Sequence, residues 1–230
     1  MKRMKKLAAL LLAVMMVCSM ALMGCGAKLD PADQVIGAMY ELALRDNATP
    51  LKDLLGFESE DDVRASIMED GGENGLLESV KAQFAAYDVE VTDEELQGMI
   101  DSVQSMLAKL TYTAEITEES KDKTTVVLKV NGFSMQEIQD VMVSTQESEM
   151  AKLTEMAIAG GDTDALREFV VNFMTEYMKN VAALEPAAET TDITVECEKL
   201  KLDVSGKEKV AWLPSDVNKF AQDVENAVFR

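Results

Sequence analysis

The chain has no histidine among its 230 residues. Histidine is the side chain that most often serves as a general base beside a serine or cysteine nucleophile, and it is the commonest metal ligand. Its absence excludes Ser-His-Asp and Cys-His catalysis and histidine metal sites. Basic residues are also scarce, with 22 lysines and arginines against 42 acidic residues. Nucleic-acid binding needs basic patches, so no nucleic-acid partner is expected.

The N-terminal segment combines basic residues with a long apolar run. Four basic residues among the first six are followed by an almost wholly apolar stretch from Leu7 to Met23. A basic start, an apolar middle and a small-residue exit are the layout of a secretory signal. As a helix the run would reach about 25 Å, less than the roughly 30 Å of a bilayer core. A cleaved signal is therefore favoured over a permanent membrane span.

The apolar run ends at Leu22-Met23-Gly24-Cys25, which resembles the lipobox of bacterial lipoproteins. A thiolate is the nucleophile that accepts a diacylglyceryl group, and the small Gly24 lets a peptidase approach the bond before Cys25. We predict that residues 1–24 are a removed signal peptide, that cleavage falls between Gly24 and Cys25, that Cys25 is lipidated, and that residues 25–29 form a short tether. The alternative is an ordinary signal peptide with a chance cysteine.

Lipidation would fix the location of the protein. Each buried methylene contributes about 0.8 kcal/mol, so two acyl chains on Cys25 would hold the chain to the lipid bilayer, at the extracytoplasmic face of the cell membrane. The removed segment carries four basic residues and no acidic one, which leaves a net charge of −24. Cys18 would leave with the signal, so Cys197 would be the one other thiol and no intramolecular disulfide is expected.

Apolar residues at spacings of three and four predict several amphipathic helices. Asp30 is expected to cap the first helix, with Pro31 in its first turn, and Thr49-Pro50 is expected to end that region. Thr92 and Ser134 each begin a capping box, with a glutamate three positions later. The apolar stripes cover Val35–Ala43, Val63–Ile67, Leu76–Tyr87, Leu96–Leu110, Met135–Met156, Leu166–Val181 and Val217–Val228.

Alternating apolar residues predict two β-hairpins. The first runs from Tyr112 to Val130 around a short polar connection. The second joins the segment Ile193–Val204 to the returning strand Val210–Leu213 through a tight turn at Ser205-Gly206. After Cys197 the apolar positions shift by one residue, which predicts a β-bulge in this strand.

Together these features resemble small lipoproteins of Gram-positive bacteria that carry a domain of unknown function. The features that carry the resemblance are Cys25 in its lipobox, the Val35–Ala43 helix, the Tyr112–Val130 hairpin, the closing hairpin through Val195–Leu202 and Trp212, and the Val217–Val228 helix. The resemblance implies a cystatin-like fold of the nuclear-transport-factor-2 or SnoaL type. This is an α+β fold with helices packed on a curved antiparallel sheet, a cone. Residues 30–230 would form this single domain, with residues 134–184 as a long helical hairpin inserted between the two β-hairpins.

Five aromatic residues are candidates for lining a cavity in such a cone, and each also fits a packed core position: Tyr112, Phe169, Phe173, Tyr177 and Trp212. Cys197 alternates with apolar residues and is expected to be buried and unreactive. The acidic, glycine-rich segment Asp70–Gly75 is not a calcium loop, because Lys81 stands where an EF-hand needs a glutamate. No metal site and no cofactor are predicted.

Two classes of function stay open. The first is a non-catalytic binding module for a small ligand or an envelope protein. In an alternative form of this hypothesis, the protein is an accessory subunit of an envelope complex and docks through residues 134–184. The second is a small enzyme with an Asp/Glu-Tyr acid–base pair, for which Tyr112 and Tyr177 are candidates. Because no acidic residue interrupts an apolar stripe, the binding module is favoured. An exposed apolar patch on the helical pair would favour docking, and a closed apolar cavity would favour a small ligand.

Overall fold

The computed structural model describes residues 29–67, 81, 84–85, 89–158 and 163–230. The chain divides into two compact units, each assembled from separate stretches. The described part of the first unit is residues 29–67, 111–131 and 189–228. The remaining described residues belong to the second unit. Gly24 and Cys25 lie outside the described residues, so the signal, the lipidation site and the tether stay predictions, as do the domain boundaries.

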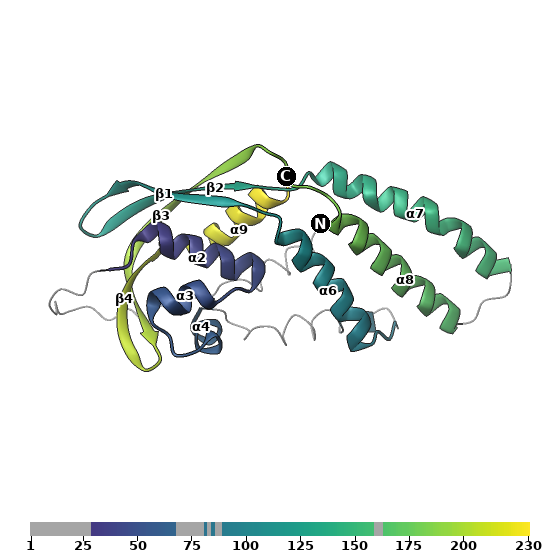
Figure 1. Ribbon diagram of the computed structural model, residues 1–230, viewed down its shortest axis with the longest axis horizontal. Coiled ribbons are helices and arrows are strands. Elements are labelled where there is room, and N and C mark those ends of the chain that lie inside the picture. The colour runs from purple at the N-terminus through teal and green to yellow at the C-terminus, as the bar shows by residue number, and fades with distance from the viewer. Residues whose placement is uncertain (1–28, 68–80, 82–83, 86–88, 159–162) are drawn as a thin grey trace. The chain divides into compact units, whose positions relative to one another are not determined.

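The first unit contains a four-stranded antiparallel sheet with the strand order β1-β2-β3-β4 (Figure 1). Both predicted hairpins are present, and the mixed α+β class is confirmed. The second hairpin turns at Ser205 and Gly206, whose φ angles of 51° and 80° are the left-handed values that a two-residue hairpin turn requires. The strands are β1 (Tyr112–Glu119), β2 (Lys123–Asn131), β3 (Thr190–Val204) and β4 (Lys207–Pro214).

The predicted bulge in β3 is wrong, although the shift in burial that suggested it is real. Ile193, Val195 and Cys197 are buried in the first half of the strand, and Leu202 and Val204 in the second. The pairing with β2 and then with β4 nevertheless runs without a break. Since side chains alternate along a strand, the two halves bury opposite faces of the sheet. The irregularity in the described strands lies instead in β1, between residues 116 and 118.

Four helices complete the described part of the first unit: α2 (Ala32–Arg45), α3 (Thr49–Leu55), α4 (Glu60–Ile67) and α9 (Val217–Val228). Helix α2 packs on β1, β2 and β4 and is buried along most of its length. Two sequence predictions fail at its ends. Asp30 does not cap α2, because its carboxylate pairs with Lys209 Nζ at 3.0 Å. Thr49-Pro50 begins α3 instead of ending a helical region, since proline is well tolerated in a first turn, where its missing N–H is not needed.

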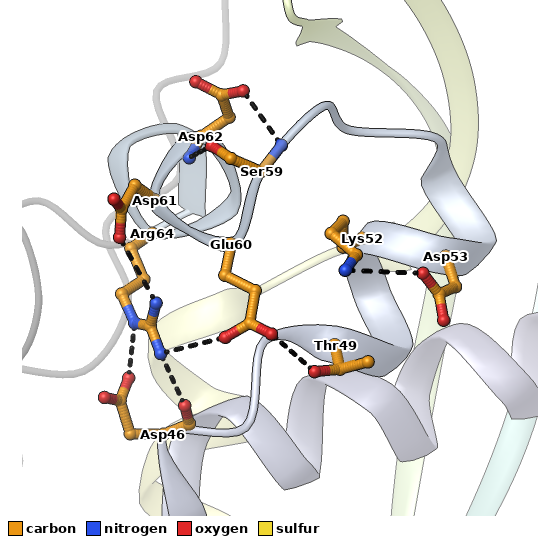
Figure 2. A network of polar contacts seen from close by, with 9 residues as sticks. All are labelled: Asp46, Thr49, Lys52, Asp53, Ser59, Glu60, Asp61, Asp62 and Arg64. Atoms are coloured by element: carbon orange, nitrogen blue, oxygen red, sulfur yellow. Dashed lines mark hydrogen bonds and ion pairs between the residues drawn. The ribbon is translucent and has the colours of Figure 1, made fainter.

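A network of polar contacts around Arg64 joins the end of α2 to α4 (Figure 2). The guanidinium donates from Nε to Asp46 Oδ1 and from a terminal nitrogen to the Asp46 carbonyl oxygen, each at 2.9 Å. Glu60 and Asp61 lie within 3.6 Å of the same group. These carboxylates hold the pKa of Arg64 above its usual value, with the hydrogen bond to Asp46 as the largest cause. One cation therefore offsets the repulsion between three acidic side chains.

The second unit contains three described helices, α6 (Asp93–Leu107), α7 (Met135–Ile158) and α8 (Thr163–Ala182). Helix α8 packs against both α6 and α7 (Figure 1). The capping box at Thr92 is complete, with Thr92 Oγ1 accepting from Glu95 N and Glu95 Oε2 accepting from Thr92 N. At Ser134 the hydroxyl accepts from Glu137 N at 3.3 Å. The stripe Leu76–Tyr87, the segment Asp70–Gly75 and the stop predicted at Gly160-Gly161 fall wholly or mostly outside the described residues.

Candidate functional site

The five candidate cavity residues are divided between the two units. Tyr112 and Trp212 belong to the sheet of the first unit, and Phe169, Phe173 and Tyr177 lie on α8 in the second. Neither unit brings all five together. Trp212 is 5% exposed on β4, with Lys199 Nζ over its ring at 4.8 Å from the centroid. Its burial is that of a core residue.

Tyr112 packs in a cluster with α2. Its ring lies 4.7 Å from that of Tyr40, centroid to centroid, and covers Gly37. Burial raises the pKa of both tyrosines, so both phenols are protonated at neutral pH. Glu41 is the carboxylate whose charge acts on Tyr112, and Arg45 binds both of its oxygens at 2.8 and 3.0 Å. Arg45 thus occupies both oxygens of Glu41, and the two tyrosine rings contact each other, so the cluster has the geometry of packed side chains.

Cys197 is buried, as its alternation with apolar neighbours predicts. It is 1% exposed, and its Sγ lies 3.7 Å from the Val195 carbonyl oxygen. Burial raises the pKa of the thiol to about 12. The thiolate is the reactive form, and at pH 8 it would make up about one part in ten thousand of this group.

We therefore expect Cys197 in the folded protein to resist an aromatic disulfide or a maleimide at pH 8 and to react fully once the chain is unfolded in guanidinium. Mass spectrometry of the peptide that contains Cys197 measures this directly. A Cys197→Ser chain gives the background. Rapid labelling of the folded chain would show that the thiol is accessible and that the buried assignment is wrong.

Two open grooves on the first unit carry charged residues. One of about 400 Å³ lies between β3 and the start of α9, and its lining includes Glu196, Asp216, Lys219 and Asp223. Another of similar size lies along the β1–β2 turn and β3 and carries four glutamates with Lys123. Neither is the closed apolar cavity expected for a small apolar ligand. In the part of the chain that the structure describes, no group of acidic residues and cysteine is arranged to hold a metal ion.

The contact between α7 and α8 includes buried polar side chains. Among the residues of α7 whose burial the structure describes, Thr145 and Glu149 are the buried ones, at 2% and 6% exposed. Asn180 Nδ2 on α8 donates to Thr145 Oγ1 at 3.2 Å, and Lys152 Nζ pairs with Glu149 Oε1 at 2.7 Å. A third groove of about 280 Å³ opens beside Glu149. Polar groups thus occupy positions of α7 where a surface helix normally buries apolar side chains.

Three large apolar side chains of the same helix are exposed. Val143, Met150 and Ile158 are 52%, 48% and 83% exposed, and Leu166 at the start of α8 is 49% exposed. On α8 the rings of Phe169 and Phe173 stack at 6.4 Å and are half-buried, as is Tyr177, whose pKa is raised by burial. The outward residues of α7 escaped the sequence analysis because they lie off its main apolar stripe.

The family of the chain follows from comparison with known proteins. The sequence model of a family described as a domain of unknown function (DUF5105) matches residues 61–207. The match covers more than half of the chain, and the chain belongs to this family. No curated protein matches the sequence.

A solved structure shares the fold. It is the crystal structure of a presumed lipoprotein (ycdA) from Bacillus subtilis, with a TM-score of 0.53 and 15% sequence identity. The similar region covers 86% of this chain and 56% of the Bacillus protein, so the present chain corresponds to little more than half of that one. At this identity the likeness shows the fold alone. Among the described residues, no helix is both long enough and apolar enough to cross a bilayer.

Proposed function

We propose that the protein is a lipoprotein anchored through acyl chains on Cys25 at the extracytoplasmic face of the cell membrane, and that its folded part binds another protein without catalysing a reaction. The observation that carries the anchor is the sequence Leu22-Met23-Gly24-Cys25 after a basic start and an apolar run. The Bacillus protein of similar fold is itself a presumed lipoprotein, which supports the proposal.

Labelling with radioactive palmitate in a Gram-positive host tests the anchor. We expect label on the wild-type chain and its recovery in the membrane fraction. Cys25→Ser should lose the label and leave the membrane fraction. Cys18→Ser is the matched control, because it removes the other thiol of the signal region and should leave labelling unchanged. Equal labelling of all three chains, or cleavage at a bond other than that before Cys25, would contradict the proposal.

Two features support a protein partner over a small ligand. The two grooves of the first unit are open and carry charged residues, and neither is the enclosed apolar cavity that a small apolar ligand requires. The helices α7 and α8 expose large apolar side chains at Val143, Met150, Ile158 and Leu166. Exposed apolar side chains that lie together are typical of protein interaction surfaces. The helical pair is therefore the preferred docking region.

We also infer that the first unit is a cystatin-like domain and that α7 and α8 form a helical insertion. In support, α2 packs across three of the four antiparallel strands. The two long helices fall between β2 and β3 in chain order, between the two hairpins. An experimental structure with a flat sheet, and with no helix covering it, would contradict this assignment.

A further inference from the structure

The outward face of α7 carries a narrow stripe in which apolar and acidic residues alternate. We define the α7 stripe as Asp140, Val143, Glu147, Met150 and Ile158, all of which are exposed. At about 100° per residue these five side chains fall within about 80° of one another, and they extend over about 27 Å of helix. The stripe thus runs along most of α7, with the exposed Thr154 on the same face between Met150 and Ile158.

This stripe is opposite to the face that α7 buries. Thr145 and Glu149 lie on the other side of the helix, and both are almost fully buried. The helix therefore already has an inward face, and Val143, Met150 and Ile158 lie on the side away from it. Large aliphatic side chains at spacings of seven and eight residues are the pattern that a second helix can cover.

The acidic residues of the stripe have no cationic partner within the described residues. Asp140 accepts a hydrogen bond from Gln136 Nε2 at 2.8 Å, and no ion pair involves Asp140 or Glu147. Helix α7 has five acidic residues and one lysine, Lys152, which pairs with the inward Glu149. The stripe is therefore apolar and negatively charged.

We propose that the α7 stripe docks a basic amphipathic helix of another protein. This inference rests on the proposed function, because it assumes a protein-binding role, and it adds the chemistry of the partner. Apolar residues of such a helix would cover Val143, Met150 and Ile158. Its lysines or arginines would face Asp140 and Glu147.

The negative charge of the stripe argues against two other binding partners, a second copy of this chain and a membrane surface. A second copy of this chain would bring its own Asp140 and Glu147 against a stripe without a basic residue, and like charges at an interface oppose association. A membrane surface with anionic lipids would be repelled by the same carboxylates. A basic helix satisfies both the apolar and the acidic side chains of the stripe.

The test is a titration of the full lipidated chain in phosphatidylcholine nanodiscs with a synthetic helical peptide of about 21 residues, with leucine at the a and d heptad positions and lysine at e and g. Empty nanodiscs give the blank. We expect saturable binding that Glu147→Lys weakens about tenfold or more. Glu168→Lys on α8 is the matched control, since it makes the same charge change at an exposed position off the stripe, and it should change the affinity by less than about twofold.

A second peptide with glutamate in place of each lysine separates the electrostatic contribution to affinity from the contribution of the apolar side chains. It should not bind the wild-type chain, and it should bind the Asp140→Lys/Glu147→Lys chain. Equal weakening by Glu147→Lys and Glu168→Lys would mean that the peptide follows net charge alone, and it would overturn the proposal. So would equal binding of both peptides, concentration-dependent self-association of the chain, or no binding at all. All these positions are exposed, so thermal unfolding should show intact folding of each variant.

These results are separable from those for the anchor. Palmitate labelling reports on Cys25 alone, and the titration reports on α7. If no label is found, the same titration is carried out with the chain in solution, and normal peptide binding there would overturn the lipid anchor and leave the docking surface in place. A labelled chain that does not bind the peptide would overturn the basic helix as the occupant.

Discussion

Replacing Trp212 with alanine is expected to lower the free energy of unfolding by about 3–5 kcal/mol. The indole is 5% exposed on β4, between the buried residues Ala211 and Leu213. Its removal would lose the transfer free energy of a large ring and leave a cavity in the sheet of the first unit. Guanidinium unfolding followed by circular dichroism measures the change.

Two further variants separate the ring from its cation. Trp212→Phe keeps most of the buried ring and should cost clearly less than Trp212→Ala. Lys199→Met removes the ammonium group that lies above the indole. The same ammonium donates a hydrogen bond to the Lys121 carbonyl oxygen, and its loss should lower the free energy of unfolding by about 0.5–1 kcal/mol. A loss below about 1 kcal/mol for Trp212→Ala would mean that the ring lines an open cavity, as a candidate ligand site requires.

Gly37→Ala is expected to destabilise the protein by about 1–3 kcal/mol, although alanine is the better helix former. A Cβ atom at Gly37 would lie 2.9 Å from Tyr112 Cε2 and 3.1 Å from its hydroxyl oxygen. The ring of Tyr112 would have to move, and with it the contact to Tyr40. Thermal unfolding of the variant measures the effect.

Gly98→Ala is the matched control. Gly98 lies within α6 and is exposed, and apart from its chain neighbours and the backbone of its own helix no atom lies within 4 Å of the position that a Cβ would take. The same substitution there should stabilise the protein by about 0.5–1 kcal/mol. In the Tyr112→Ala background, Gly37→Ala should lose most of its cost, because the clash is gone. Equal effects at the two glycines would refute close packing at Gly37.

Much of the secondary structure follows from sequence patterns, and the failures have identifiable causes. The capping box at Thr92 and the hairpin turn at Ser205-Gly206 depend on local chemistry, which a short window of sequence contains. The face that β3 buries depends instead on which elements cover each half of the strand. The same shift of apolar positions therefore suggested a bulge where the register is unbroken.

The candidate site was harder to predict than the fold. Periodicity identified the inward stripe of α7, since Ile138, Met142 and Met156 follow helical spacing. It could not show that Thr145 and Glu149 would be buried beside them, because that depends on partners such as Asn180 on another helix. Nor could it show that Val143 and Met150 would be left outside. Which face of a helix is covered is a tertiary property.

The order in which the chain supplies its strands bears on how the protein is made. Strand β3 pairs with both β2 and β4, yet it begins 59 residues after β2 ends, at Thr190. Until this stretch is available, β1 and β2 form an isolated hairpin, which is marginally stable at best in water. A chain threaded through a translocation channel from its N-terminus would thus stay unfolded in this region until its last fifth had arrived. On the proposed route of export, late completion of the sheet would keep the chain competent for translocation, and this unit would fold only after most of the chain had crossed.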